Sequence, residues 1–532
     1  MTTQKQINHV FTTHAKPLRK LVISHIANST APIPQIGYGG LSRAMAATVT
    51  FQAMSGHEVR LYAPADSSII QFVEKTARAM KRKSEISEDG RTITITSYPP
   101  GKLPIKGTLT LRTTGEEALG YGLSATKTEC NTRLCNLLVA DETGATTDPV
   151  TGKALFKPCD IIHVHRVNNI PLLFEAGLGS KVVATAHSGT FDHPEIYDAY
   201  PYPMINISEA DQNRLRSVPN IHKSDRLGVV KLSVMPTEIT PNMGETAGYL
   251  VILGRIIEFR GQETAIEIAR QTDKVLVIAG DITTPQAQAY KDKVLSQVDY
   301  VDTELFNRLE NKSPEEIRIE LERLRAEHGN GKSGFVIYIG GITNRQKRVL
   351  LPNAAAGLFP TSTHEAFGMA MAECLCAGTP IIGWAKYNDK TTGAVKATGS
   401  VRELIQGRDN GVLIDADTEE GRFKQAVDAV NNIAAISRAT VRKRFILDLS
   451  TLREVRDLEL AYYALLNQKL VGRYYDAVRP GGNDSPHAAL HRRYWRSVGI
   501  RYRFSSELNA KFKKDPALAR RPAVRQPEMR MR

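Results

Sequence analysis

The sequence predicts an α/β protein with at least two domains, each built on a parallel sheet. At 532 residues the chain is longer than one ordinary hydrophobic core supports. An apolar run at 21–26, a loop rich in Gly and Pro, an apolar-periodic helix at 41–54 and a second apolar run at 58–63 form the pattern of a βαβ unit. A second unit of this kind begins at Tyr249, after a polar segment at 240–247.

These patterns divide the chain into four parts. We expect an N-terminal Rossmann-like domain at 18–240 and a C-terminal Rossmann-like domain at 248–450. A helix at 451–470 is expected to cross back to the first domain. Residues 471–532 form a basic, aromatic extension.

Composition is typical of a soluble globular protein, with 42% apolar and 24% charged residues. No apolar run approaches the roughly 20 residues that span a bilayer. Five cysteines, a small and odd number with no signal peptide before them, are expected to be reduced, buried thiols rather than disulfides or zinc ligands. We therefore expect a cytoplasmic protein.

The net charge of +14 is concentrated at the C-terminal end. Residues 471–532 hold fifteen Lys and Arg against five Asp and Glu, a balance of +10, which leaves +4 for the first 470 residues. The globular part is therefore nearly neutral, and the cations of the extension are interspersed with Tyr, Trp and Phe.

The loop after the first strand suits a phosphate. Gly39 and Gly40 end this loop at the start of the first helix, where glycine lets the backbone approach a ligand and helix N–H groups are unpaired. A Gly pair alone is more often only a turn. The loop does not have the G-x-G-x-x-G spacing, so it does not predict a nicotinamide cofactor.

Two further strands of the first domain end in histidine. They run at 160–165 and 181–187, which places imidazoles at the carboxyl ends of strands, where open α/β sheets bind ligands. For His163 and His165 we favour a hydrogen-bonded core position. For His187 we favour the ligand site.

Two stretches carry no recognisable chemistry. Residues 66–157 contain an alternating strand at 92–96, which we expect to pair with 109–111, and a polar loop at 141–157. Residues 282–334 are a charged, helix-rich insert.

The C-terminal domain opens with a strand at 250–253 that is followed by Arg255. Arg260 comes five residues later, just before a helix at 263–270. Most surface arginines are only solvated, but two cations around a helix start can hold a diphosphate.

The most informative stretch, 361–383, carries two carboxylates. Glu365 lies in a strand-to-helix loop, and Glu373 lies within the helix expected at 367–377. A carboxylate accepts hydrogen bonds from two hydroxyls at once, so the pair suits a ligand rich in vicinal hydroxyls, such as a sugar and a ribose. An arbitrary pair at this spacing is more often two solvated charges.

Four segments together resemble one enzyme family. They are Y-G-G-L-S-R-A at 38–44, D-I-I-H-V-H at 160–165, G-R-I-I-E-F-R-G at 254–261 and E-A-F-G-M-A-M-A-E-C-L-C-A-G-T-P-I-I-G at 365–383. The chain resembles the retaining glycosyltransferases of the family-four group, which have an E-x7-E motif and the GT-B fold. The resemblance implies two facing Rossmann-like domains with the reaction in the cleft between them. The polar stretch at 386–398 is expected to form an extended loop over that cleft.

The resemblance implies roles for the cations and the histidine. In the family two cations hold the donor diphosphate, which implies this role for Arg255 and for Arg260, where the family usually has Lys. The backbone N–H groups of Gly39 and Gly40 would assist them. His187 would lie near the donor sugar.

The E-x7-E segment implies the remaining contacts. Glu365 and the backbone of Phe367, Gly368 and Met369 would hold the sugar, and Glu373 would hold the ribose. The implied donor is a nucleoside-diphosphate sugar, expected to be a UDP-sugar, with retention at the anomeric carbon. No prosthetic group and no metal are expected, because the two cations can neutralise the departing diphosphate, which would itself act as the base.

The extension at 471–532 lies beyond what the family normally carries, and three interpretations stay open. It docks on the enzyme itself or on a partner subunit, it binds an acceptor in DNA, as in enzymes that glycosylate modified bases of viral DNA, or it binds an anionic membrane, where a lipid or polysaccharide precursor is the acceptor. A non-catalytic sugar-nucleotide-binding protein is the alternative of another class. The oligomeric state is left open.

Overall fold

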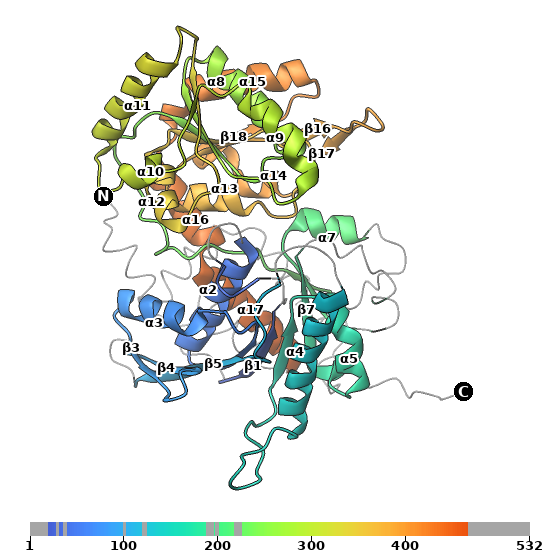
Figure 1. Ribbon diagram of the computed structural model, residues 1–532. Helices are drawn as coiled ribbons and strands as arrows, with labels where there is room; N and C mark the ends of the chain where they lie inside the picture. The colour runs from blue at the N-terminus through green and yellow to red at the C-terminus, as the bar shows by residue number, and fades with distance from the viewer. Residues whose placement is uncertain are drawn as a thin grey trace, which may run out of the picture.

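The computed structural model describes residues 20–27, 31–35, 40–98, 103–119, 125–187, 196, 200, 202–216 and 226–466. Within these residues the chain forms two α/β halves, each around its own sheet (Figure 1). The predicted fold class, two facing Rossmann-like domains, is confirmed. Gly39 and the extension at 471–532 lie outside the described residues.

The first half is built on a mixed sheet of nine described strands. They are β1 (Val22–Ile26), β2 (Glu58–Tyr62), β3 (Lys83–Ile86), β4 (Thr92–Ser97), β5 (Ile105–Arg112), β6 (Ile161–Val164), β7 (Val182–Ala186), β8 (Met204–Asn206) and β9 (Arg226–Val229). Their order is β3-β4-β5-β2-β1-β6-β7-β8-β9. All neighbours are parallel except β3 with β4 and β4 with β5, so the predicted pairing of 92–96 with 109–111 is confirmed. The register of β1 and β6 puts His25 opposite His163.

Helices lie on both faces of the first sheet. They are α2 (Gly40–Met54), α3 (Ile69–Ala79), α4 (Ala125–Thr143), α5 (Ile170–Glu175), α7 (Glu209–Arg216) and the late helix α17 (Thr451–Leu466). Successive residues of β1 face opposite ways, so Val22 packs in the cluster of α4 and α5 whereas Ile23 packs in the cluster of α17. The prediction of a loop from residue 141 is wrong at its start. Asp141 lies in the last turn of α4, where its carboxylate accepts a hydrogen bond from Arg112 Nε at 2.7 Å.

The second half is built on a parallel sheet of seven described strands. They are β10 (Leu250–Leu253), β11 (Val275–Ala279), β12 (Tyr300–Val301), β13 (Phe335–Tyr338), β14 (Ala356–Phe359), β15 (Ile381–Trp384) and β18 (Gly411–Ile414). Their order is β12-β13-β11-β10-β14-β15-β18. The chain runs outward from β10 to β11 on one side and later returns to β14 on the other, so the switch point lies between β10 and β14. Open α/β sheets bind ligands outside the carboxyl ends of strands at such a point, and Arg255 and Glu365 follow these two strands.

The helices of the second half and its C-terminal continuation complete the layers. They are η5 (Glu258–Arg260), α8 (Gln262–Gln271), α9 (Gln288–Leu295), α10 (Leu305–Arg308), α11 (Pro314–His328), α12 (Asn344–Asn353), α13 (Met369–Cys376), α14 (Val401–Leu404), α15 (Glu419–Asn431) and α16 (Arg438–Leu449). The predicted helix-rich insert at 282–334 is confirmed, and it also supplies the edge strand β12. α13 begins two residues later than predicted, because Gly368 adopts a left-handed conformation with φ of 91°.

The stretch at 386–398 is not the extended loop that we expected. It folds into an antiparallel hairpin of β16 (Lys386–Asn388) and β17 (Val395–Ala397). Asp389 organises the turn, since its side chain accepts hydrogen bonds from the backbone N–H groups of Thr391 at 3.1 Å and Thr392 at 2.9 Å.

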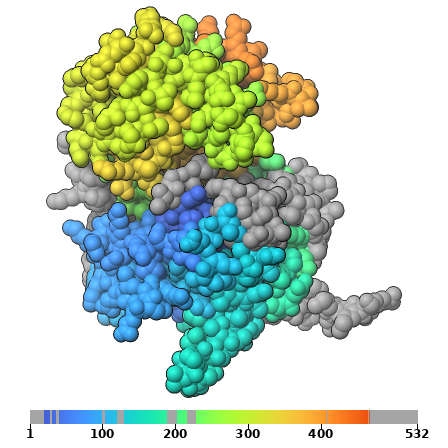
Figure 2. Space-filling model, in the orientation of Figure 1, coloured from blue at the N-terminus to red at the C-terminus, as the bar shows by residue number. Residues whose placement is uncertain are grey.

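The two halves are held together by α7 and α14. The carboxylate of Glu403, on α14, accepts hydrogen bonds from the backbone N–H groups of Glu209 at 3.0 Å and Ala210 at 2.8 Å. These groups start α7 and have no intrahelical partner, so a carboxylate from the other half stabilises them. One cluster of buried apolar residues also runs from α2 into α12. In Figure 2 the yellow-green second half lies directly above the blue and cyan first half.

The five cysteines and the hydropathy agree with the expectations for them. All five cysteines are buried and free, as predicted. Among the described residues, no helix is both long and apolar enough to cross a membrane.

Candidate active site

Glu365 is held at the end of β14 by its backbone. Its N–H donates a hydrogen bond to the Thr398 carbonyl at 2.9 Å, and its carbonyl accepts one from the Ser400 N–H at 2.9 Å. Gly399 lies between these two partners, and a Cβ there would approach the Glu365 carbonyl oxygen to 2.5 Å. The loop after β17 therefore fixes the position from which the carboxylate of Glu365 projects.

One arginine contacts this carboxylate, and a second lies on the same aromatic ring as the first. Arg260, at the end of η5, forms an ion pair with Glu365, and their side chains are 26% and 12% exposed. The guanidinium carbons of Arg255 and Arg260 lie 5.9 Å and 5.7 Å from the ring centre of Phe259. Nε of Arg255 is buried and has no hydrogen-bond partner among the described residues. The loop after β10 thus presents two cations, one of them with an unused donor, at the switch point of the sheet.

Glu373 lies in α13 and is paired with a cation that the sequence did not single out. Lys347 Nζ, on α12, lies 2.7 Å and 2.9 Å from the two carboxylate oxygens, and both side chains are almost fully buried. Arg43, on α2 of the first half, pairs with Glu238. Burial lowers the pKa of Arg43, and the negative charge of Glu373 opposes that shift. Glu373 therefore sits among cations from both halves.

The starts of α2 and α13 meet across the two halves. A Cβ on Gly40 would lie 3.1 Å from the Cβ of Met369, so only a glycine permits this approach without displacement. A Cβ on Gly368 would meet the Met371 side chain at 2.2 Å. Phe367 is buried, and its carbonyl accepts a hydrogen bond from the Ser400 hydroxyl at 2.8 Å. The structure thus brings together Gly40 and the backbone segment predicted to hold the sugar.

His187 belongs to a separate group in the first half. It follows β7, and its Nε2 lies 2.8 Å from Nδ1 of His165. Its Nδ1 is buried without a hydrogen-bond partner among the described residues. Burial lowers the pKa of His187 to about 3, so the ring is neutral.

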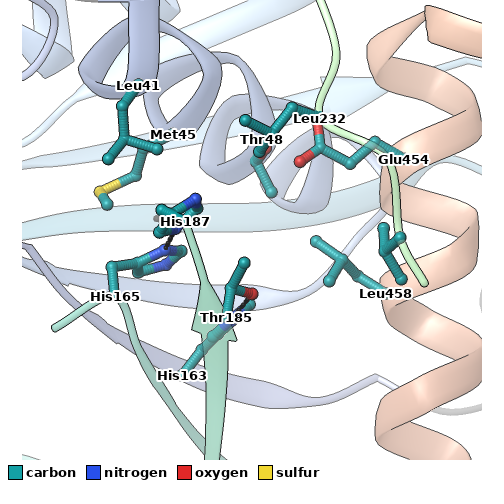
Figure 3. A pocket seen from close by; sticks show the side chains of 11 residues that line it. Leu41, Met45, Thr48, His163, His165, Thr185, His187, Leu232, Glu454 and Leu458 are labelled. Atoms are coloured by element: carbon teal, nitrogen blue, oxygen red, sulfur yellow. Dashed lines mark hydrogen bonds between the residues drawn. The ribbon is translucent and has the colours of Figure 1, made fainter. Parts of the chain in front are cut away.

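The neighbouring pocket is lined by α2, α17 and the ends of β6 and β7 (Figure 3). Its lining residues are Leu41, Met45, Thr48, His163, His165, Thr185, His187, Val230, Leu232, Glu454 and Leu458. Among the described residues, no hydrogen bond or ion pair connects His187 with Arg255, Arg260, Glu365 or Glu373. The structure therefore places the predicted residues in two groups, and α2 contributes to both.

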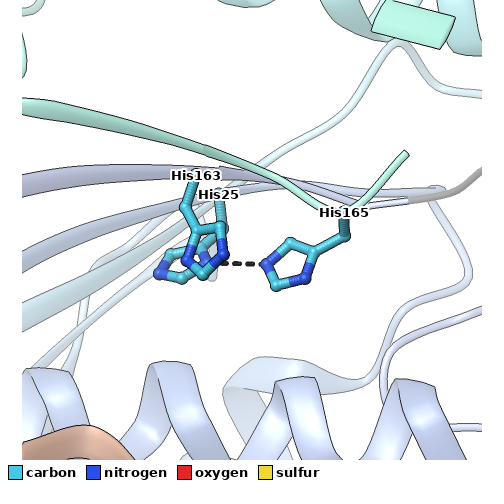
Figure 4. Close-up of side chains that lie close together, drawn as sticks. All are labelled: His25, His163 and His165. Carbon is cyan, nitrogen blue, oxygen red and sulfur yellow. Dashed lines mark hydrogen bonds between the residues drawn. The ribbon is translucent and has the colours of Figure 1, made fainter. Parts of the chain in front are cut away.

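Three histidines of the first half lie close enough to hold a metal ion, with candidate ligand atoms within 4.8 Å of one another (Figure 4). They are His25, His163 and His165. Two of the three ring pairs are stacked, however, with interplanar angles of 20° between His25 and His165 and 23° between His163 and His165, while His25 and His163 are tilted by 38°. Each of the six ring nitrogens already has a hydrogen-bond partner. This geometry favours a hydrogen-bond network over a metal centre, and the expectation of a metal-independent site stays a prediction.

Comparison with known proteins defines the fold. No family model and no curated protein matches the sequence. The structure is similar to a glycosyltransferase from Rickettsia africae ESF-5, with a TM-score of 0.54 and 12% identity over 85% of this chain and 100% of that chain. It is less similar to AviGT4, a glycosyltransferase involved in avilamycin A biosynthesis (TM-score 0.49, 15% identity, 84% of this chain and 98% of that chain). Anabaena Alr3699/HepE, solved in complex with UDP and glucose, has a TM-score of 0.49 and 13% identity over 82% of this chain and 98% of that chain. The chain has the GT-B fold.

Proposed function

We propose that this protein is a retaining glycosyltransferase that transfers a sugar from a nucleoside-diphosphate donor to an acceptor hydroxyl. The observation that carries the proposal is the group formed by Arg255, Arg260 and Glu365 at the switch point between β10 and β14. Two cations that share the Phe259 ring, one of them paired with a carboxylate, suit a ligand that has a diphosphate at one end and sugar hydroxyls at the other.

The diphosphate binds Arg255 and Arg260 in this scheme. The unused Nε donor of Arg255 is available to a phosphate oxygen, and Arg260 is shared between the diphosphate and Glu365. In the reaction the bond between the anomeric carbon and the diphosphate oxygen breaks, and negative charge grows on the leaving group. Fixed guanidinium groups stabilise this charge more in the transition state than in the ground state, which accelerates the step.

The sugar and ribose bind the E-x7-E segment. Glu365 and the backbone of Phe367, Gly368 and Met369 hold the sugar, while Glu373 accepts hydrogen bonds from the ribose hydroxyls. Lys347 supports this role because its ammonium group fixes the position of the carboxylate, and each carboxylate oxygen keeps a lone pair for a ligand.

The acceptor hydroxyl attacks from the face that the diphosphate leaves, so its oxygen bonds to the anomeric carbon with retention. Its proton passes to a diphosphate oxygen, which balances the reaction without a protein nucleophile. The cations supply the charge stabilisation that a metal ion would supply elsewhere, which supports a metal-independent reaction.

A nucleotide-sugar screen tests the proposal. We expect at least one nucleoside-diphosphate sugar, with UDP-sugars screened first, to raise the melting temperature of the full chain and to be slowly hydrolysed without an acceptor. NMR analysis of the transferred product is expected to give the same anomeric configuration as the donor. Binding without any hydrolysis or transfer would instead support a non-catalytic sugar-nucleotide-binding protein, and inversion would contradict the retaining mechanism.

We further propose that the acceptor is DNA bound through the basic extension at 471–532. Its balance of +10 and its interspersed aromatic residues suit phosphates and unstacked bases. Duplex DNA is expected to bind in a salt-dependent manner, and truncation after residue 470 is expected to abolish binding. Binding to anionic vesicles but not to DNA would favour a lipid or polysaccharide precursor as the acceptor.

A further inference from the structure

A line of hydrogen-bonded side chains leads from the core of the first half to His187. Gln52 Oε1 lies 2.7 Å from Nε2 of His25, and Nδ1 of His25 lies 3.0 Å from Nε2 of His165. Nδ1 of His165 in turn lies 2.8 Å from Nε2 of His187. The dashed lines of Figures 3 and 4 mark the last two contacts. His25 and His165 therefore each use one ring nitrogen toward the core and the other toward His187.

Neutral imidazoles in such a line must all point their protons the same way, because each has one N–H donor and one bare nitrogen. Burial lowers the pKa of His25 to about 4 and that of His187 to about 3, and it holds the pKa of His165 well below its ordinary value. The three rings are therefore neutral near pH 7. Two arrangements remain, with every proton on Nε2 or every proton on Nδ1.

Tyr462 decides between these two arrangements. Its hydroxyl lies only 2.6 Å from Nδ1 of His163, a distance typical of an O–H donor rather than an N–H donor. The phenol therefore donates to His163, and its oxygen is left to accept. The other partner of that oxygen is Nε2 of Gln52 at 3.3 Å, which donates as an amide N–H. This fixes the orientation of the Gln52 amide, so that its carbonyl oxygen faces His25.

The proton order follows from Gln52 outward. The Gln52 carbonyl accepts from Nε2–H of His25, whose bare Nδ1 accepts from Nε2–H of His165. The bare Nδ1 of His165 then accepts from Nε2–H of His187. This leaves Nδ1 of His187 without a proton and, among the described residues, without a partner.

We propose that Gln52, His25 and His165 are positioning residues that hold His187 in the Nε2–H tautomer, so that its Nδ1 accepts a hydrogen bond from a ligand hydroxyl. The adjoining pocket has room for a group about the size of a hydroxyl or a water molecule. A buried acceptor without a donor is costly, so a hydroxyl that reaches Nδ1 gains a hydrogen bond that an apolar group in the same place cannot make. The inference rests on the proposed function only for the identity of that hydroxyl.

The tautomers can be measured without any activity assay. The full chain is labelled with 15N-histidine, and two-bond proton–nitrogen correlation spectra are recorded from pH 6 to pH 8. Single substitutions such as His187→Gln assign the signals. We expect His25, His163, His165 and His187 all to be Nε2–H tautomers, with Nδ1 bare. Nδ1–H tautomers at His25, His165 and His187 would overturn the proposal.

Two variants break the line and one matched control spares it. Gln52→Leu and His25→Phe are expected to turn the single tautomer of His187 into a mixture. Thr50→Val removes a buried hydroxyl of the same helix as Gln52, which donates to the Ala46 carbonyl at 2.6 Å, and is expected to leave the signals of His187 in place. If Gln52→Leu and His25→Phe fold and leave the tautomer of His187 unchanged, the line has no positioning role.

Zinc and turnover give two further readouts. Addition of Zn²⁺ to the full chain is expected to leave these signals unchanged, and stoichiometric zinc on His25 and His165 would overturn the proposal in favour of a metal centre. With the donor and acceptor found by the screen, Gln52→Leu is expected to lower kcat about tenfold while KM for the donor changes little. A wild-type chain without transferase activity would contradict the proposed function, whereas its tautomers would still decide the positioning role.

Discussion

The hydrogen-bonded line that leads to His187 in the first half is made of neutral groups, whereas the site around Glu365 and Glu373 in the second half is made of charged ones. Around His187 the buried groups are imidazoles, an amide and a phenol, joined by hydrogen bonds that leave each group uncharged. Around Glu365 and Glu373 they are carboxylates matched with Arg260 and Lys347. Under the proposed function, this difference matches a ligand whose anionic part lies against the second half and whose neutral, hydroxyl-bearing part lies against the first half.

The two designs also carry different costs. A buried ion pair stays favourable only while both partners are present, because removal of one leaves an unpaired charge. A neutral network instead depends on every donor having an acceptor, and it resists protonation because a buried cation is poorly solvated. The two halves should therefore fail in different ways when they are perturbed.

The largest expected effect follows from removal of Arg255. Arg255→Ala is expected to lower transferase turnover by about 10²- to 10³-fold, because a fixed donor to the leaving group is lost. The melting temperature should change little, since Arg255 forms no ion pair among the described residues. Steady-state kinetics and thermal unfolding check the two statements. Arg318→Ala is the matched control, because Arg318 is a surface residue paired only with Glu315. Equal turnover in Arg255→Ala and in the control would show that the cation plays no part.

The next effect concerns the buried pair in the second half. Glu373→Gln is expected to reduce the free energy of unfolding by about 3 kcal/mol, because Lys347 is left buried without its counter-charge. Adding Lys347→Met should restore more than half of this loss without restoring donor binding. Urea unfolding and calorimetric titration measure the two quantities. Donor binding that returns with stability would mean that Glu373 acts only through folding.

A smaller effect is the loss of folding stability in acid, and we expect its main source to lie in the first half. The pKa of His25 is about 4 in the folded chain and near 6.5 when unfolded, so the unfolded chain binds the extra proton between these values. Stability is therefore lost as the pH falls from 6.5 toward 4, by about 1–3 kcal/mol for this residue. Urea midpoints at pH 7.5 and pH 4.5 test this, and His25→Phe should shrink the difference. A difference of the same size in the variant would remove His25 as its source.

The smallest expected effect is a change of stability with pH that is opposite in sign to the one from His25. Burial raises the pKa of Glu454, which lines the pocket beside His187, to about 7, above its unfolded value near 4.5. The folded chain then holds the extra proton, so stability falls as the pH rises from 4.5 to 7. Glu454→Gln should raise the free energy of unfolding at pH 8 by about 1–2 kcal/mol and leave it nearly unchanged at pH 4.5. A variant that is no more stable than wild type at pH 8 would argue against this burial cost.

The charged site of the second half could be predicted from the sequence because the positions of its residues follow from local patterns. Arg255 and Glu365 each follow an apolar strand, and the stop signals at Gly378 and Pro380 place Glu373 within a short helix. Lys347 was missed because nothing in N-R-Q-K-R distinguishes this buried lysine from the exposed Arg345 and Arg348. Its partner is 26 positions away, and only the packing of α12 on α13 brings them together.

The histidine network of the first half was harder to predict for a physical reason. His163 was correctly favoured as a core residue, whereas His165 is only partly buried and lines the pocket. The network also needs His25, which lies on a strand 138 positions earlier and reaches His163 only through the register of β1 and β6. Gln52 and Tyr462 come from helices 410 positions apart. Such contacts depend on strand order and helix packing, which local periodicity does not encode. The hairpin at 386–398 was missed because its polar turn residues resemble those of a loop.

The charged site of the second half is tested most directly by calorimetric titration. The ligand is the nucleoside diphosphate that binds most tightly in the screen. Wild type, Arg255→Ala and Arg318→Ala are compared at low and high salt. We predict that Arg255→Ala weakens binding at least tenfold and flattens its salt dependence, while Arg318→Ala binds as wild type. Identical affinities and salt dependences in all three chains would contradict a diphosphate site at the switch point of the second sheet.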